Sequence, residues 1–343
     1  MNFRKKSRSK KPLIIAVTAV VLIIIILNHW NYKKQINTAV DPKDTKNISF
    51  VIKPGTSAKS VALDLEEKNL ITSENALYKY IKKEDLGQKI NAGRFNLNRS
   101  MTPMQIASEL VNPTKSEAVF TMQEGLTIKQ IDEKLSKEGL AEAGEFVSAV
   151  EDFSDWSSYP FLNEKAQSKL KYKLEGYIYP DTYFLDKNSF QAKDLIKLGL
   201  DNFSKKFTPI QDQVSGRSIQ EIITMASIVE NEVFGKADRK MVADLLWRRL
   251  NSNWMIGADI TVIYATGNRD ITYQDLQIDS PYNTRKFTGL PPGPVSNPSI
   301  ESIEAVVNPT PNEYWFYLTT LDTGEVIYAK TNEEHNANKN KHL

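Results

Sequence analysis

Hydrophobic residues of this chain form one long run near its start and shorter periodic groups after it. The run Leu13–Leu27 is apolar except at one position, with basic residues before it and Trp30 and Tyr32 after it. A membrane span needs about 20 apolar residues, and basic and aromatic flanks extend a shorter run. We therefore expect a single-pass anchor over residues 13–30 in the cell membrane, with residues 1–12 as a cytoplasmic basic tail and the rest extracellular.

The residues after this run are polar. A cleaved signal peptide, the alternative to an anchor, would need a site of small residues, and residues 28–32 are bulky or polar. The stretch 31–47 has no hydrophobic periodicity. We interpret it as a linker.

Two later segments repeat each other. Residues 54–70 and 124–140 align without gaps at an offset of 70, with Gly55 matching Gly125 and Leu65 matching Leu135. In each copy a short β run precedes a glycine and two helical patterns, and a glycine with an aromatic-rich strand follows. This βααβ order resembles a LysM-like module, a type associated with glycan strands that contain N-acetylglucosamine. The resemblance assigns residues 48–115 to one module and about 118–185 to a second; a duplicated scaffold without binding is the alternative.

The second half of the chain mixes helical and strand patterns. The stretch Leu174–Leu185 alternates and predicts a strand, and Ala237–Leu250 carries a helical apolar stripe. Residues 314–320 and 325–330 predict a hairpin, and a helix is expected from Asn297–Pro298 through Val307. The fold class is therefore α+β: a transmembrane helix, a LysM-like βααβ module and a mixed α+β domain over residues 116–343.

One acidic residue interrupts an apolar helical face. At about 100° per residue, Glu230 falls between Ile219 and Ile223 on the apolar arc, whereas Glu232 falls about 160° away among polar positions. A carboxyl group in apolar surroundings has a raised pKa and can stay protonated as a general acid. We expect this environment for Glu230 and a solvated Glu232; the alternative is a Glu230 head group that reaches water.

Composition removes several classes of function. The chain has no cysteine, which excludes disulfides, thiol catalysis and cysteine-bound metal. The formal charge of +2 becomes about −4 without the six basic residues before the apolar run, so nucleic-acid binding has no support. No metal-ligand spacing, phosphate loop or Ser-His-Asp pattern is present, and we expect neither a metal nor another cofactor.

Five ordered strings carry a family resemblance. They are EGYIYPDTY, MASIVENE, ITVIY, YNTRKFTGLPPGP and EHN, and they span most of residues 174–336. With these strings the chain resembles the endolytic murein transglycosylases, the MltG or YceG-like family. Two positions depart from the family pattern: Asn231 stands where lysine is frequent, and Ile260 stands where proline is common.

The resemblance implies an enzyme that cleaves the bond between N-acetylmuramic acid and N-acetylglucosamine within nascent peptidoglycan strands. The products would carry 1,6-anhydro ends, and cleavage would limit strand length. The catalytic domain would cover residues 116–343, and the family's catalytic glutamate maps onto Glu230. The implied partners are peptidoglycan glycan strands, the cytoplasmic membrane and the machinery of wall synthesis.

Other polar residues of these strings are candidates for holding the sugar. They are Tyr282, Asn283 and Thr284, followed by Asp181, Thr182, Asp259 and Thr261. Turn or capping chemistry is an equal alternative for each of them. Secondary candidates are Glu175, Glu232, His335 and Asn336. For the two glutamates a solvated surface acid, and for His335 a structural hydrogen-bond partner, are the simpler interpretations.

Two other functions remain open at this point. A two-carboxylate muramidase would use Asp259 or Asp181 as the second acid and would consume water. A glycan-binding scaffold would have no chemistry at all. The ends of the digested glycan distinguish these from transglycosylation.

Overall fold

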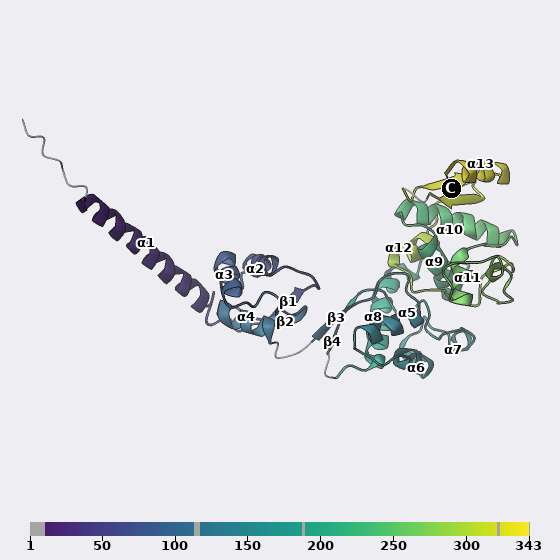
Figure 1. Ribbon diagram of the computed structural model, residues 1–343. Helices are drawn as coiled ribbons and strands as arrows, with labels where there is room; N and C mark the ends of the chain where they lie inside the picture. Colours follow the sequence, from purple (N-terminus) through teal and green to yellow (C-terminus); the bar gives the residue numbers. More distant parts are fainter. Residues whose placement is uncertain (1–10, 113–116, 187–188, 321–322, 343) are drawn as a thin grey trace, which may run out of the picture. The chain divides into compact units, whose positions relative to one another are not determined.

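The structure is a computed structural model that describes residues 11–112, 117–186, 189–320 and 323–342, with backbone only for 11–19 and 21. The chain divides into two compact units (Figure 1). One comprises residues 1–119 with 186–188, and the other comprises residues 120–185 with 189–343. Each unit has a hydrophobic core of its own.

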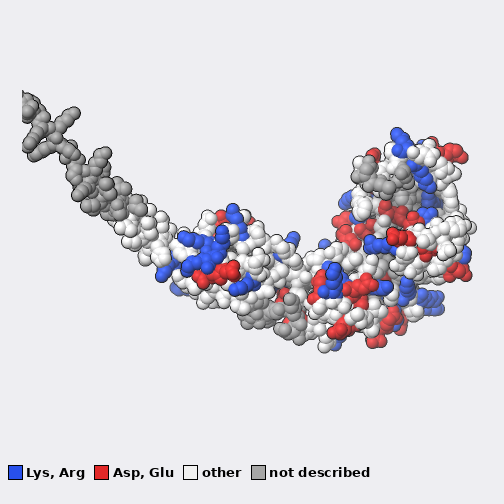
Figure 2. Space-filling view, viewed as in Figure 1, with Lys and Arg blue, Asp and Glu red and all other residues white. Residues whose placement is uncertain are grey.

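The first unit consists of helices and one strand pair. Its elements are α1 (Lys11–Asn37), β1 (Ile48–Ile52), α2 (Ala58–Glu67), α3 (Glu74–Lys83), β2 (Gly93–Leu97) and α4 (Pro103–Val111). Strands β1 and β2 are antiparallel, with Ile48 opposite Leu97. The order β1–α2–α3–β2 is the one that the repeat predicts, and the likeness to LysM modules stays a prediction. On the face in Figure 2, basic side chains gather over α3, which carries Lys79, Lys82 and Lys83.

The expected transmembrane anchor is wrong. Across the described part of the chain, no helix combines the length and apolar content needed to cross a membrane. The apolar run of 15 residues falls short of the roughly 20 required. Helix α1 instead continues through polar residues, and its last turns pack against α3 and α4 with Ile36 buried. The predicted single-pass membrane localisation, with a cytoplasmic N-terminus and an extracellular catalytic domain, depended on this anchor and is therefore not supported.

The second unit contains most of the helices of the described chain. Its elements, with two strands that begin or end at the unit boundary, are β3 (Glu117–Thr121), α5 (Ile128–Lys137), α6 (Glu145–Glu151), α7 (Glu164–Gln167), β4 (Thr182–Asp186), α8 (Ala192–Gln211), α9 (Ile219–Glu232), α10 (Lys236–Asn251), α11 (Asp259–Thr266), α12 (Ile300–Val307), β5 (Phe316–Thr319), β6 (Val326–Ala329) and α13 (Asn332–His342). Short 3₁₀ turns lie at 156–158 and 275–277. Strands β3 and β4 pair, and β5 pairs with β6 in the antiparallel hairpin that the sequence predicts. The α+β part of the fold class is therefore correct.

Helix α9 lies at the centre of this unit. A capping box begins it, because Ser218 accepts from the backbone N–H of Glu221 while the Glu221 carboxylate accepts from the backbone N–H of Ser218. Every residue of Ile222–Glu230 is buried, because α9 packs against α10, α11 and α12. A helix covered on several sides has no wide polar face. The division of α9 into an apolar face and a solvated face, which a helical wheel predicts, therefore does not hold.

Two local predictions differ from the structure. Of the alternating stretch Leu174–Leu185, only the last four residues belong to a strand, β4 (Thr182–Asp186). Gly176 instead turns the chain at a φ of 89°, where a Cβ atom would lie 2.6 Å from Pro294, so the tight turn requires glycine. Helix α12 is capped by Ser299 and not by Asn297. The buried Asn297 amide group instead donates to the carbonyl of Leu126 at 2.9 Å.

Candidate active site

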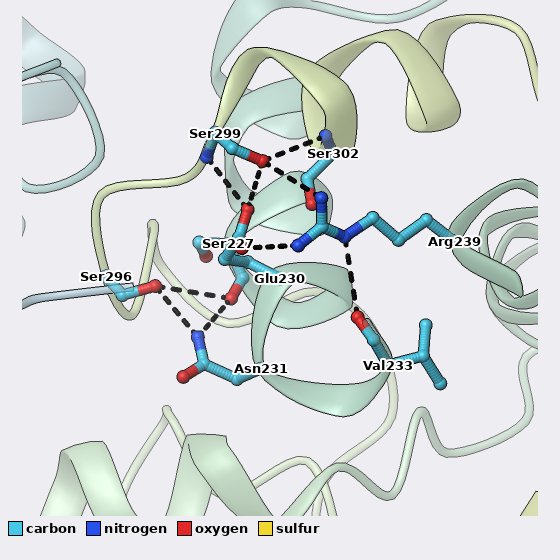
Figure 3. Close-up of polar contacts among 8 residues, drawn as sticks. All are labelled: Ser227, Glu230, Asn231, Val233, Arg239, Ser296, Ser299 and Ser302. Carbon is cyan, nitrogen blue, oxygen red and sulfur yellow. Dashed lines mark hydrogen bonds and ion pairs between the residues drawn. The ribbon is translucent and has the colours of Figure 1, made fainter. Parts of the chain in front are cut away.

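Glu230 is buried, but polar partners surround its carboxylate (Figure 3). Arg239 from α10 donates from Nη2 to Oε1 at 2.7 Å. Ser299 donates to Oε2 from its backbone N–H at 2.8 Å and from its hydroxyl group at 2.5 Å. The Glu230 and Arg239 side chains are only 5% and 9% exposed. This closed ion pair ties α9 to α10 and to the start of α12.

Glu232, two residues further along α9, has a different environment. It is half-buried and lines a cavity, and the Tyr317 hydroxyl group of β5 donates to its Oε2 at 2.7 Å. Burial raises the pKa of the Glu232 carboxyl group and Asp259 adds to the rise, against the opposing effects of Tyr317, Arg285 and Arg249. The expectation of a solvated Glu232 is wrong, because the β5–β6 hairpin covers this end of α9.

The cavity beside Glu232 has a volume of about 1160 Å³. Its wall comes from the start of α5, the end of α9, the turn after α10, α11, strand β5 and α13. Asn231 and Glu232 line it and Glu230 does not. Asn231 is held by its amide group, which donates to the Ser296 hydroxyl group and the Ser227 carbonyl, each at 2.9 Å. A cavity of this size exceeds the range of about 300–1,000 Å³ typical for small ligands and has room for several sugar rings.

The three leading candidates for holding the sugar do not line the cavity. Tyr282, Asn283 and Thr284 are all buried. The Asn283 amide group donates to the carbonyls of Leu276 and Ile278, each at 3.0 Å. Asn283 thus bonds within its own loop, as the turn interpretation predicts, whereas the Tyr282 hydroxyl group accepts from the backbone N–H of Lys171 at 3.3 Å.

Thr261 and Thr284 join this loop to α11. Their hydroxyl groups lie 2.8 Å apart, and the Thr284 hydroxyl group accepts from the backbone N–H of Ala258. The next residue, Arg285, makes an ion pair with Asp259 at the start of α11, and both side chains line the cavity. Of the seven predicted sugar-holding residues, only Asp259 reaches the cavity wall.

Asp181 and Thr182 lie elsewhere in the second unit. The Asp181 carboxylate accepts from the Asn202 amide group of α8 at 2.8 Å. The Thr182 hydroxyl group lies 3.2 Å from that of Thr121 across the β3–β4 pair. Neither residue lines the cavity. Their interactions stabilise the strand pair and its link to α8.

Glu175 is fully buried, which contradicts the expectation of a solvated acid. It accepts from the backbone N–H of Ile128 and from the Tyr264 hydroxyl group, both at 3.0 Å, and from the Asn297 amide group at 3.3 Å. Burial outweighs these donors and raises the pKa of Glu175 to about 8. Tyr264 lines the cavity, so its hydrogen bond to Glu175 stabilises the cavity wall.

His335 and Asn336 lie in α13. The His335 ring lines the cavity and stacks on Phe316 with centroids 5.2 Å apart. Burial lowers the pKa of His335, and Lys339 and Arg249 lower it further. Asn336 is exposed and lies outside the cavity wall. The described residues contain no group of His, Asp and Glu side chains that could hold a metal ion.

Sequence reasoning missed Tyr317, Arg249 and Trp254 as cavity residues. Tyr317 is 85 residues from its partner Glu232. No local pattern reports such a distant approach. The alternation of the hairpin strands does predict that some residues of β5 face inward, and this was the one available signal.

A family model, the YceG-like family, matches residues 50–341 of this chain. The chain belongs to the YceG-like family. This confirms the resemblance drawn from the ordered strings. The matched residues include both repeat copies and every cavity residue named above.

Curated relatives share this family character along most of the chain. A protein of Bacillus subtilis strain 168 named endolytic murein transglycosylase is 31% identical over 331 residues, which cover 93% of this chain and 91% of the relative. A protein of the same name from Streptococcus pneumoniae serotype 2 is 30% identical and matches over 89% of this chain but only 60% of its own length. The expectation of a lytic transglycosylase family is confirmed by these names.

A solved structure has the same fold. It is the 2.6 Å crystal structure of a putative YceG-like protein from Listeria monocytogenes, which is 30% identical to this chain. The match has a TM-score of 0.61 and covers 85% of this chain and 98% of the other.

Proposed function

We propose that this chain is an endolytic peptidoglycan lytic transglycosylase in which Glu232 is the general acid and base. The observation that carries the residue assignment is that Glu232 lines the large cavity with a raised pKa. A general acid needs access to the substrate and a proton at working pH. Glu232 meets the first condition because it lines the cavity, and the rise of its pKa on burial favours the second.

The proposed reaction needs one carboxyl group and no external water. Protonated Glu232 donates to the oxygen between N-acetylmuramic acid and N-acetylglucosamine, and the bond from that oxygen to the muramyl C1 breaks. The Glu232 carboxylate then takes the proton of the muramyl C6 hydroxyl group while O6 attacks C1. This yields the 1,6-anhydro end, frees the 4-hydroxyl group of N-acetylglucosamine and restores the protonated acid.

Glu230 is reassigned to a structural role. Its two carboxylate oxygens are occupied by Arg239 and Ser299, and its side chain lies outside the cavity wall. A proton donor in this position would have to break a buried ion pair before reaching a sugar. Glu230, which the resemblance marks as catalytic, is therefore better explained as a residue that holds α9, α10 and α12 together.

Tyr317 positions the proposed acid, whereas Asp259 is the second acid of an alternative reaction. The Tyr317 hydroxyl group orients the Glu232 carboxyl group by its 2.7 Å hydrogen bond. Asp259 lines the same cavity, so a two-carboxylate hydrolase is the second candidate. Its ion pair with Arg285 opposes a role as a free base. The ends of the product distinguish the two reactions.

The test is digestion of purified peptidoglycan strands by the full-length protein, followed by mass analysis. Transglycosylation gives anhydro ends that are lighter by one water than the reducing ends of hydrolysis. Glu232→Gln is expected to lower the rate by about 10³-fold or more, whereas Glu325→Gln, an exposed carboxyl group on the hairpin, retains it. Reducing ends alone, or a fully active Glu232→Gln protein, would contradict the proposal.

The finer parts of the function rest on the family resemblance. They are cleavage within nascent strands, a limit on strand length and association with the wall-synthesis machinery. The size distribution of the products tests the first of these, because endolytic cleavage of a long strand releases long fragments early. A digest that yields only disaccharides from the start would contradict endolytic action.

A further inference from the structure

An aromatic surface is left open inside the cavity. Trp254 and Met255, in the turn after α10, line the cavity and are each 39% exposed. The Trp254 ring lies 5.1 Å from that of Trp315 and 5.6 Å from that of Phe316, which meets it edge-on at 85°. Phe316 also lines the cavity. Apolar area exposed in an otherwise polar cavity indicates a ligand with an apolar face.

The chain holds this turn in a fixed conformation. Asn253 has a left-handed φ of 54°, and the backbone N–H of Trp254 donates to the carbonyl of Arg249 at 2.9 Å. The Arg249 guanidinium group donates to the carbonyl of Ile256 at 2.7 Å and to that of Trp315 at 2.6 Å. The turn that carries Trp254 is thus fixed, and Trp315 packs beside its indole, before a ligand arrives. Binding to such a preorganised ring loses little conformational entropy.

The aromatic surface adjoins the proposed acid. Phe316 and Tyr317 are neighbours in β5, and Tyr317 carries the hydroxyl group that donates to Glu232. Arg249, which holds the turn of Trp254, is also close enough to Glu232 to lower its pKa. Glu232 and Trp254 line the same cavity, so a chain molecule that places a bond at Glu232 can extend toward Trp254.

We propose that Trp254 forms a stacking subsite for one pyranose ring of the glycan strand, next to the glycosidic bond that is cleaved at Glu232, with Phe316 beside it in the cavity wall. The C–H groups on one face of a pyranose are apolar and slightly positive, so they are attracted to the negative face of an indole or phenyl ring. This inference rests on the proposed function for the position of the cleaved bond, but binding at the subsite does not need cleavage.

The test measures binding in a protein that does not cleave. Full-length Glu232→Gln is titrated with GlcNAc–MurNAc oligosaccharides that lack stem peptides, and tryptophan fluorescence and calorimetry report binding. Adding Trp254→Leu is expected to weaken binding about tenfold and to remove most of the fluorescence change, because one stacked ring is lost. Adding Trp254→Tyr keeps a ring and should leave the affinity within about threefold. Tyr273→Ala, which removes an aromatic ring that is 78% exposed and outside the cavity, is the matched control with unchanged affinity.

The pair of Trp254 variants separates stacking from packing. If the Trp254→Leu protein binds as tightly as its parent, or if Tyr273→Ala weakens binding equally, the subsite is overturned. If the Trp254→Leu protein does not fold, Trp254→Tyr decides the question. A folded Trp254→Tyr protein that loses affinity would contradict stacking. A loss seen only with peptide-bearing strands would identify the stem peptide as the occupant and would also overturn the proposal.

The same variants tell the two proposals apart. If the parent protein with Glu232 makes no anhydro ends but Trp254-dependent binding persists, the proposed function fails and the subsite stands. If anhydro ends form and Trp254→Leu changes neither affinity nor KM, the subsite fails and the function stands. In active protein we expect Trp254→Leu to raise KM about tenfold with kcat within about threefold, because the ring contributes to binding and not to bond breaking.

Discussion

At the residue scale, Glu230 and Glu232 stand two positions apart on α9 but have opposite surroundings. Arg239 and Ser299 enclose the first, and the cavity and Tyr317 adjoin the second. Removing the charge of each residue therefore has a different consequence. One change should act on folding and the other on chemistry.

Glu230→Gln is expected to lower the free energy of unfolding by about 3–5 kcal/mol, because it leaves the Arg239 guanidinium group buried without its counter-charge. Glu232→Gln should change it by less than about 1 kcal/mol, because Glu232 has no such ion pair among the described residues. Urea unfolding of both variants measures the difference. A Glu230→Gln protein with parental stability and no activity would restore Glu230 as the acid.

The pH dependence of activity follows from Glu232. The acid must be protonated, so kcat/KM should decline as the pH rises through the raised pKa of Glu232. The Tyr317 hydrogen bond opposes this rise, so Tyr317→Phe should raise the pKa further and move the alkaline limb to higher pH. A pH–rate profile of both proteins checks this. A limb that moves to lower pH in Tyr317→Phe would contradict the role of Tyr317.

At the element scale, Glu175 joins three elements that carry the cavity wall. Its partners are the first residue of α5, Tyr264 of α11 and Asn297 before α12. The Glu175 carboxyl group at this joint is fully buried. Its protonation should therefore affect how firmly these elements are held.

The pKa of Glu175 is raised from 4.5 to about 8 in the folded protein, so the folded state binds its proton more tightly. The resulting stabilisation is complete below about pH 4.5 and is lost as the pH rises through about 8, with a slope of up to about 1.4 kcal/mol per pH unit between. Glu175→Gln cannot titrate and should show a flatter dependence in this window. Urea unfolding from pH 5 to pH 9 compares the two. Parallel curves for the two proteins would refute the linkage.

At the scale of the whole molecule, the two units have separate cores. Leu77 is fully buried in the core of the first unit, and Glu232 lies in the second. Separate cores allow separate unfolding transitions. A change in one core should therefore leave the other unit intact.

We expect Leu77→Ala to lower the stability of one calorimetric transition by about 2–5 kcal/mol and to leave the second unchanged. The proteolytic fragments that survive partial unfolding should then contain the second unit. Glu325→Gln serves as the surface control with both transitions in place. If both transitions of Leu77→Ala shift together, the units fold as one cooperative body.

The sequence by itself determined the family, the helix that bears the two acids, the hairpin and the order of the elements in the first repeat copy, because these depend on local periodicity and on ordered strings. It also determined that Glu230 and Glu232 point in different directions. Only the tertiary structure decided which direction leads to the cavity. A helical wheel gives the angle between two side chains, but the cover over each comes from residues 9 and 85 positions away, Arg239 and Tyr317. The same limit applies to α1. The residues that flank its apolar run suggested a membrane span, but no described helix is long and apolar enough to cross a membrane, and the last turns of α1 pack against α3 and α4.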